Sequence, residues 1–209
     1  GSNTGFYKGE KIVGRLDWHI DLHYTGRPNH GALLRAVVVP QDDGLTGFGD
    51  LAAAYDALSD DIKAQLQDLE IAYAFCMQRK HMRYVNLEGY EPGPQSPRKP
   101  SDMNFPDFAD TVYPAVHTHP ISGRKVLGTV EQFLDRITNR SVIGLSNDEA
   151  IELLEYLIDH IRKPEFHYFH EGREGDMVLW DNWRAIHCTT GTRPGVKRLI
   201  NRTTIAGDV

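Results

Sequence analysis

The clearest hydrophobic periodicity in the chain lies between residues 146 and 164. Ser146 and Glu149 have the spacing of a capping box, in which each side chain bonds the other residue's backbone N–H. Apolar residues then recur at helical spacing, at Ile151, Leu154, Leu157, Ile158 and Ile161. Lys163-Pro164 follows, and proline cannot continue a helix interior. The pattern predicts a helix that begins after Ser146, ends before Pro164 and packs its apolar face on a sheet.

Two shorter helices are predicted earlier in the chain. Asp50 can cap a helix over residues 51–58, because its carboxylate can accept hydrogen bonds from the first free backbone N–H groups. Ser59 can cap a second helix that runs to about residue 69.

Much of the remaining chain has the composition of short strands. Six stretches qualify: 31–39, 71–77, 165–171, 177–180, 184–189 and 197–206. Turn residues at 172–175 and 191–195 separate the late ones. Short strands divided by turns, with helices gathered elsewhere, predict a mainly β fold with flanking helices, either a barrel or a jelly roll.

The pattern weakens from about residue 81 to residue 120. Seven of the eleven prolines lie there, together with several aromatic residues: Tyr84, Tyr90, Phe105, Phe108 and Tyr113. A connection of this length inside a compact domain is usually functional or disordered. We predict a lid over an active site; a solvent-facing loop without a role is the alternative.

Composition limits the class of protein. The chain has 209 residues, which suits one domain, and Gly1-Ser2 is typical of a cleavage remnant, so we place the domain at 3–209. A net charge of -6 argues against nucleic acid or an anionic membrane as the main partner. The chain has no apolar run that approaches a membrane span. We expect a cytoplasmic protein that acts on a small molecule and that could form a homo-oligomer.

Cys76 and Cys188 are the only cysteines. They form neither a disulfide framework nor a CxxC pair, which agrees with a reducing compartment. Cys188 directly follows His187, so a nucleophile is conceivable. Neighbours on a strand point to opposite faces, however, and Cys188 is therefore expected to pack away from any site at His187.

Candidate metal ligands lie at both ends of the chain. His19 and Asp21 are two residues apart, so in an extended segment both side chains lie on one face. His187 lies in an apolar stretch near the other end. Two imidazoles and one carboxylate that leave open positions are the ligand set of non-haem iron oxygenases. The same three residues also suit zinc.

Other histidines compete for the same role: His23, His117, His119, His167 and His170. His117 and His119 also have a spacing of two and could be a ligand pair on a strand. Their position in the proline-rich stretch favours the His19 set.

Two arginines follow the late histidine. Arg198 and Arg202 are four residues apart, so on a strand they share a face with Ile200 and Thr204. A buried guanidinium requires an acceptor, and a carboxylate fits it in a bidentate manner. The arginines therefore suggest an anionic co-substrate; two surface arginines on an edge strand are the alternative.

These motifs, in this order, resemble the taurine dioxygenase/TfdA family of Fe(II)- and 2-oxoglutarate-dependent oxygenases. The resemblance runs from about residue 17 to residue 208. It is carried by Trp18-His19-x-Asp21, Gly44-Leu45-Thr46, Phe48 to Leu58, His119-Pro120-x-x-Gly123-Arg124, Trp180-Asp181-Asn182, His187, Arg198 and Arg202.

The resemblance implies a double-stranded β-helix, or jelly roll, with helices outside. It implies that His19, Asp21 and His187 bind iron, and that Arg198 and Thr46 hold the distal carboxylate of 2-oxoglutarate. Arg202 would then contact an anionic group of the substrate. The implied reaction consumes O2, oxidises a substrate C–H bond, most often by hydroxylation, and releases succinate and CO2.

The chain departs from the family pattern in three places. The usual Gly-Gly-Asp-Thr is Asp43-Gly44-Leu45-Thr46 here, and the residue after Trp-Asp-Asn is Trp183 instead of arginine, with Arg184 one later. Only eighteen residues precede His19, so the family's N-terminal portion is expected to be missing. A zinc or manganese hydrolase and a catalytically inactive metal- or anion-binding barrel remain the alternatives.

Overall fold

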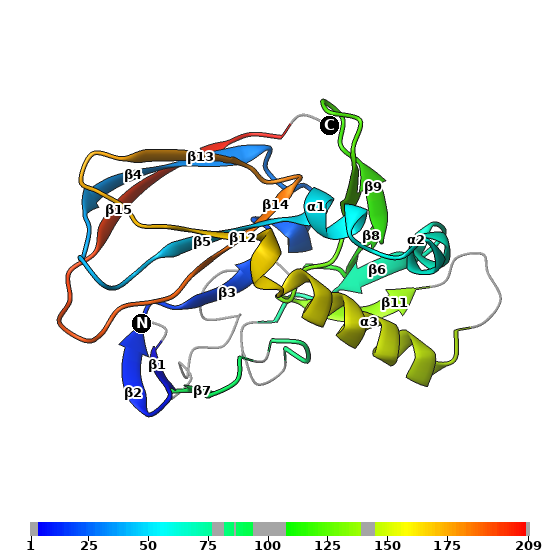
Figure 1. Ribbon diagram of the computed structural model, residues 1–209, viewed down its shortest axis with the longest axis horizontal. Coiled ribbons are helices and arrows are strands. Elements are labelled where there is room, and N and C mark those ends of the chain that lie inside the picture. Colours follow the sequence, from blue (N-terminus) through cyan, green and yellow to red (C-terminus); the bar gives the residue numbers. More distant parts are fainter. Residues whose placement is uncertain (1–3, 77–81, 86, 94–107, 139–144, 208–209) are drawn as a thin grey trace.

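A computed structural model of the chain describes residues 4–76, 82–85, 87–93, 108–138 and 145–207 (Figure 1). Its centre is two antiparallel sheets. The first has four strands in the order β12 (His167–His170), β5 (Thr46–Asp50), β14 (Ala185–Thr189) and β3 (Leu16–His19). The second has three strands in the order β13 (Met177–Asp181), β4 (Gly31–Val38) and β15 (Leu199–Ile205).

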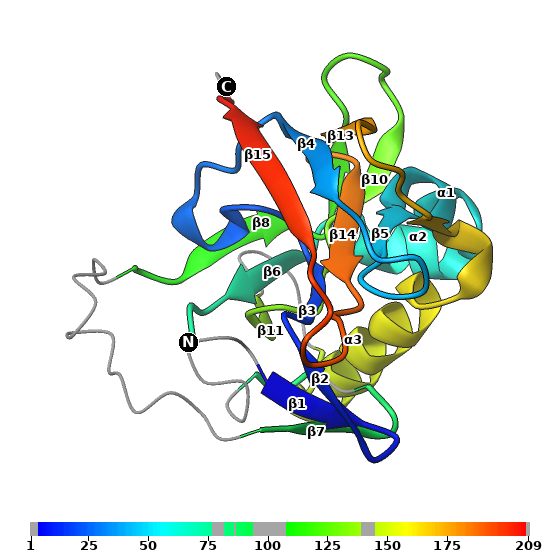
Figure 2. The same cartoon turned by 90° about the vertical axis from the view of Figure 1, so that its left-hand side faces the viewer.

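The two sheets face one another, as the separate layers in Figures 1 and 2 show. Trp180 of β13 crosses the space between them, with its ring 5.6 Å from that of Phe48 and 4.7 Å from that of His187. The inner face of the first sheet therefore contains Thr46, Phe48 and His187, because alternate residues of a strand share a face. The prediction of a mainly β fold is confirmed.

The outer face of the first sheet is crowded enough to require glycine. A Cβ atom at Gly47 would lie 2.8 Å from both Cys188 Sγ and the Trp18 ring. The ring of Trp18 in turn packs against that of His167, with centroids 4.3 Å apart and planes inclined by 33°. Cys188 thus packs on the face opposite His187, as predicted, and burial raises the pKa of its thiol to about 12.

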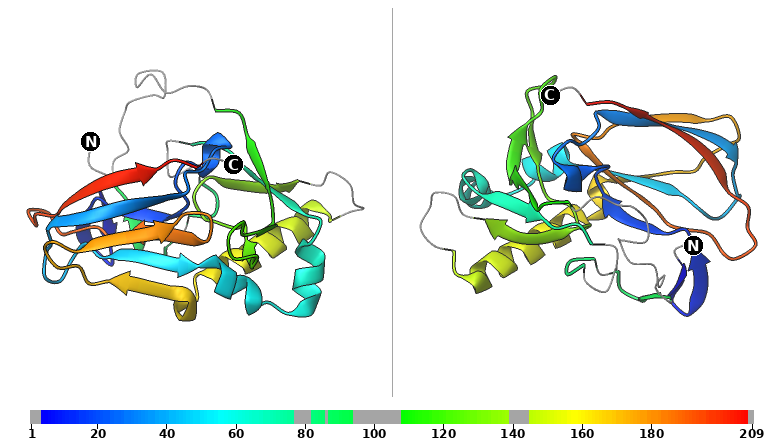
Figure 3. Two further views of the ribbon diagram at one scale, coloured as in Figure 1. Left: turned by 90° about the horizontal axis from the view of Figure 1, so that it is seen from above. Right: turned by 180° about the vertical axis from the view of Figure 1, so that it is seen from behind.

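The helices gather at one end of the molecule (Figure 3). They are α1 (Leu51–Asp56), α2 (Asp60–Leu66) and α3 (Asn147–Ile161). The capping box of Ser146 and Glu149 is present, and Asp50 and Ser59 accept hydrogen bonds from the first turns of α1 and α2. Buried side chains of α3 include Leu154, Leu157, Ile158 and Ile161.

Both short helices end before the predicted residue. Helix α1 stops at Asp56 because Ser59 must be extended to cap α2, with φ -66° and ψ 156°. Helix α2 stops at Leu66, and a turn then leads into β6 (Glu70–Tyr73). The predicted strand over 71–77 likewise ends at Tyr73; residue 77 lies outside the described part.

Several strands were not predicted. β11 (Leu134–Thr138) and β8 (Thr111–Pro114) pair with the two edges of the predicted β6, and β9 (Val116–Thr118) pairs with β10 (Lys125–Leu127). A further sheet joins β2 (Glu10–Val13), β1 (Thr4–Tyr7) and β7 (Tyr90–Pro92). Each is only three to five residues long, so alternation alone cannot identify it.

Three of these strands, β7, β8 and β9, lie within 81–120, where the sequence pattern predicted no regular element. Residues 81, 86 and 94–107 fall outside the described part, and the lid stays a prediction. The late strands β12, β14 and β15 are also shorter than predicted, because a 3-10 turn at Pro164–Phe166 precedes β12 and Arg184 belongs to the turn before β14. Strand β13 instead extends one residue further than predicted, to Asp181. No helix among the described residues is long and apolar enough to cross a membrane.

Candidate metal centre and anion site

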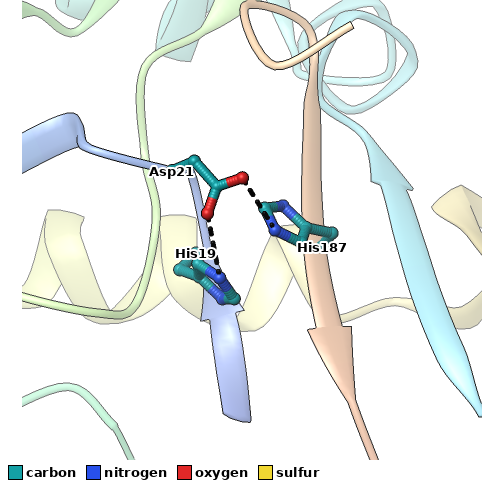
Figure 4. Close-up of side chains that lie close together, drawn as sticks. All are labelled: His19, Asp21 and His187. Atoms are coloured by element: carbon teal, nitrogen blue, oxygen red, sulfur yellow. Dashed lines mark ion pairs between the residues drawn. The ribbon is translucent and has the colours of Figure 1, made fainter. Parts of the chain in front are cut away.

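Sheet register brings the three candidate metal ligands together. His19 is the last residue of β3 and is the register partner of His187 in β14. Asp21 follows in the turn after β3. The His-x-Asp segment was predicted to be extended, and only its first residue lies in a strand. The Asp21 carboxylate nevertheless points back to both rings, with Oδ1 3.7 Å from His19 Nε2 and Oδ2 3.4 Å from His187 Nε2 (Figure 4). All three donor atoms lie within 4.8 Å of one another.

The surroundings of the rings favour metal-binding forms. His19 Nδ1 is 2.7 Å from the backbone oxygen of Asp17, which turns Nε2 toward Asp21. Burial is the main cause that lowers the pKa of His19, and the neighbouring His187 is the second. Together they bring this pKa to about 3. A neutral imidazole is the form that binds metals. His187 Nδ1 is buried without a hydrogen-bond partner in the described structure.

Asn182 holds the backbone of Asp21. This side chain is fully buried; its oxygen accepts from Asp21 N–H at 3.0 Å, and its amide donates to the Asp21 carbonyl oxygen at 3.1 Å. The same amide donates to the Asn29 carbonyl oxygen at 3.0 Å. Asn182 therefore pairs with both backbone groups of Asp21, as a neighbouring strand would. It holds the turn that carries this candidate metal ligand in place. Sequence reasoning quoted this residue as a motif but assigned it no role.

The two arginines have different surroundings. Arg202 Nη2 donates to Asp21 Oδ2, and its guanidinium lies 5.8 Å from the Trp180 ring. Arg198 precedes β15 and donates to Thr46 Oγ1 at 2.9 Å. Burial lowers the pKa of Arg198, and no carboxylate of the described residues lies within ion-pair distance of it. Arg198 thus has a hydroxyl partner only, whereas Arg202 contacts a candidate metal ligand.

Each arginine lines its own cavity. Arg198 and Thr46 lie at a small cavity of about 30 Å³ with apolar walls that include Leu34, Val178 and Ile200. A larger cavity of about 410 Å³ lies beside the metal candidates and is lined by His19, Ile20, Asp21, Leu22, Tyr24, Gln132, Arg202 and Thr204. Arg198 and Ile200 line the small cavity, and Arg202 and Thr204 line the larger one. These linings agree with the prediction that the four side chains share one face of the strand.

The competing histidines lie elsewhere. His117 Nε2 is 2.9 Å from the Trp183 carbonyl oxygen, and His119 Nε2 is 2.7 Å from Asp181 Oδ2. The remaining three contact a tyrosine ring, a backbone oxygen and a carboxylate: His23, His167 and His170. Across the described residues, the group of three or more possible ligands is His19, Asp21 and His187.

Trp183 and Arg184, which differ from the family pattern after Trp-Asp-Asn, both make specific contacts. Trp183 stacks on His30, with ring centroids 4.3 Å apart and planes inclined by 10°. Arg184 donates to Asp50 at 3.0 Å and 2.5 Å. Burial by itself would raise the pKa of Asp50, but the Arg184 hydrogen bonds and the amides of α1 lower it below its ordinary value. Arg184 thus ties β14 to the start of α1.

Comparison with known proteins agrees with this fold and site. The profile of the "Taurine catabolism dioxygenase TauD, TfdA family" matches residues 2–204. The chain is 33% identical over 197 residues to the (S)-phenoxypropionate/alpha-ketoglutarate-dioxygenase of Sphingobium herbicidovorans, covering 94% of this chain and 64% of that protein. It is 30% identical over 191 residues to the alpha-ketoglutarate-dependent 2,4-dichlorophenoxyacetate dioxygenase of Burkholderia sp. (strain RASC), covering 91% and 58%.

The solved structures show the same likeness. The crystal structure of AAD-2 in complex with Mn(II) and N-oxalylglycine superposes with a TM-score of 0.71 at 29% identity, covering 91% of this chain and 68% of that one. The chain therefore belongs to the TauD/TfdA family, which confirms the predicted resemblance. It spans less than two thirds of the length of the two curated relatives.

Proposed function

We propose that His19, Asp21 and His187 bind Fe(II), and that the chain belongs to an Fe(II)- and 2-oxoglutarate-dependent dioxygenase. The observation that carries the proposal is the convergence of these three donor groups within 4.8 Å. Their chemistry fits ferrous iron: two neutral imidazoles and one carboxylate are its facial ligand set. Arg202 at the Asp21 carboxylate supports the fit, because this carboxylate already attracts a cationic partner.

Arg198 and Thr46 form the proposed site for the distal carboxylate of 2-oxoglutarate. A half-buried guanidinium with only a hydroxyl partner carries a charge that an anion can neutralise. Thr46 is two residues from Phe48, the register partner of His187, which places the two sites about 7 Å apart along β5. An extended five-carbon dicarboxylate suits this arrangement, with one end at Arg198 and the other toward the metal ligands.

The reaction that we propose is the oxidation of a C–H bond. Bound iron would supply the activation of O2, with one oxygen atom entering succinate as 2-oxoglutarate loses CO2 and the other entering the substrate as a hydroxyl group. The protein's part is to orient and to shield. Arg198 fixes the co-substrate, Asn182 fixes Asp21, and the rings of Phe48 and Trp180 fill the space between the sheets and limit water.

The proposed substrate is a small organic anion. The cavity of about 410 Å³ beside the candidate ligands has room for such a molecule. Arg202 lines it and can offer a charge to the substrate once a metal takes over Asp21. The two relatives are named for phenoxypropionate and 2,4-dichlorophenoxyacetate, both of which are anionic. Hydroxylation as the outcome, the jelly-roll arrangement, the lid, a homo-oligomer and a cytoplasmic location stay predictions.

An anaerobic titration tests the proposal. Fe(II) and 2-oxoglutarate added together to the protein are expected to give a weak visible absorption band that neither gives alone. Admission of O2 with a small aromatic or aliphatic carboxylate is then expected to release succinate. A zinc hydrolase would give neither result, and an inactive barrel would give the band without succinate.

A further inference from the structure

Gly44 lies directly against the side chain of Arg198. Its backbone has φ +69°, a left-handed conformation that favours glycine. A Cβ atom at this position would lie 2.5 Å from Arg198 Cδ, 3.1 Å from Arg198 Nε and 2.9 Å from Thr192 Cγ2. The first distance is far below van der Waals contact, so any side chain here requires something to move.

The backbone on both sides of this contact is fixed. Gly44 N–H donates to the Gly191 carbonyl oxygen at 3.0 Å, and Leu45 N–H donates to Thr190 Oγ1 at 3.0 Å. Thr192 exchanges backbone hydrogen bonds with Val13 at 2.8 Å and 2.9 Å, and it is buried. Neither loop can withdraw without losing these bonds. The arginine side chain is therefore the part that would yield.

Displacement of Arg198 matters because of where its guanidinium ends. Arg198 Nη2 reaches Thr46 Oγ1, two residues beyond Gly44 on the same chain segment. We propose that Gly44 is a positioning residue: the missing side chain lets the arginine lie along the loop and aim its charge at the co-substrate carboxylate. This inference rests on the proposed function of Arg198 and Thr46 as the 2-oxoglutarate site.

The neighbours of Gly44 have other tasks. Asp43 Oδ2 accepts from Arg193 Nε at 2.7 Å on the exposed side of the loop. The Leu45 backbone bonds Thr190 through both its N–H and its carbonyl oxygen. Within the altered Asp43-Gly44-Leu45-Thr46 segment, Thr46 accepts a hydrogen bond from Arg198, and Gly44 leaves free the space that the Arg198 side chain occupies.

The test compares Gly44→Ala with Gly9→Ala. Gly9 has φ +83° and no atom within 4 Å of its Cβ position, so alanine there imposes similar backbone strain without a contact. Mn(II) affinity, 2-oxoglutarate affinity of the Mn(II)-loaded protein and melting temperature are measured anaerobically by calorimetry. We expect Gly44→Ala to bind 2-oxoglutarate about 10- to 100-fold more weakly, with Mn(II) affinity unchanged. Gly9→Ala is expected to lower only the melting temperature.

A double variant decides whether Gly44 acts through Arg198. If it does, Gly44→Ala combined with Arg198→Gln binds 2-oxoglutarate no more weakly than Arg198→Gln alone. Two results would overturn the inference and leave the proposed function intact. One is a double variant whose loss of 2-oxoglutarate affinity equals the product of the two single losses. The other is a Gly44→Ala protein that binds 2-oxoglutarate as tightly as Gly9→Ala does. Absence of 2-oxoglutarate binding by the unaltered Mn(II)-loaded protein would overturn the proposed function, and this inference with it.

Discussion

The two candidate sites share the space between the sheets but differ in whether their charged side chains have a partner of opposite charge. At the triad, the Asp21 carboxylate is surrounded by two imidazoles and by Arg202, and its backbone is held by Asn182. At the other site, Arg198 has the hydroxyl of Thr46 as its polar partner. The first site is electrostatically satisfied before a ligand binds, and the second is not. A buried charge without a counterion costs free energy, so the Arg198 site gains more from an anion.

This contrast also separates the two arginines, to which the family resemblance assigned different anions. A cation at the triad would compete with Arg202 for the Asp21 carboxylate, so we expect metal binding to weaken the Arg202 contact and to turn its guanidinium toward the adjoining cavity. Arg198 needs no such exchange. We therefore expect the order of binding to matter for the substrate anion but not for 2-oxoglutarate's distal carboxylate.

The largest expected effect is that of Asp21→Ala on metal binding. Loss of the only carboxylate of the triad is expected to weaken Mn(II) binding by at least about 100-fold, since even outer partners of metal ligands contribute about 10- to 100-fold. Electron paramagnetic resonance of free Mn(II) measures this. Asp56→Ala, which removes an exposed partner of Arg124, is the matched control. An unchanged Mn(II) affinity in Asp21→Ala would remove the metal centre from the proposal.

Arg198→Gln breaks the other side of the comparison. Removal of a charge-assisted bond to a carboxylate is expected to weaken 2-oxoglutarate binding by about 10- to 100-fold, with Mn(II) affinity nearly intact. Calorimetry on the Mn(II)-loaded protein measures both. Arg124→Gln, at an exposed ion pair, is expected to change neither. Equal losses of metal and 2-oxoglutarate affinity would show that the two sites are not separate.

Asn182→Ala tests whether metal binding at the triad depends on the hydrogen bonds that hold the backbone of Asp21. The variant leaves the N–H and carbonyl groups of Asp21 without their buried partner, which is expected to cost about 1–3 kcal/mol of unfolding free energy. We also expect Mn(II) affinity to fall by about tenfold, because the ligand is no longer held in place. Urea unfolding and Mn(II) titration check the two effects, with the exposed Asn201→Ala as control. A loss of stability without a loss of Mn(II) affinity would limit Asn182 to folding.

The smallest effect is expected outside both sites, at the Asp50–Arg184 pair. Asp50→Asn keeps an acceptor for the α1 cap and removes the charge, so it is expected to cost about 0.5 kcal/mol of unfolding free energy at pH 7. The folded pKa of Asp50 lies below its ordinary 3.8. The contribution is therefore complete above pH 3.8 and is lost as the pH falls through the lower folded pKa.

Urea unfolding from pH 7 down to pH 3 measures this difference. The curves of the parent and Asp50→Asn are expected to converge at the acidic end. Arg184→Gln should match Asp50→Asn at pH 7, and neither variant should alter Mn(II) or 2-oxoglutarate affinity. A gap that widens toward low pH would mean that Arg184 does not stabilise the ionised carboxylate.

Local signals in the chain were sufficient for the elements that depend on local physics. The capping box of Ser146 and Glu149, the caps at Asp50 and Ser59 and the strand at Gly31–Val38 all lie where sequence reasoning put them. The missed strands are only three to five residues long, and such short segments become strands only through their partners. They are β1, β2, β3, β5, β7, β8, β9, β10 and β11.

For the site, the sequence by itself determined which residue types were available and in what order: a His-x-Asp, a late histidine and two arginines. Only the tertiary structure decided what each one touches. Asn182 clamps Asp21 from 161 positions away, and Arg202 reaches the same residue from 181 away. Gly44 gives Arg198 its room across a similar gap in the chain. Burial and charge pairing are properties of neighbours in space, and sheet register, not chain order, selects those neighbours.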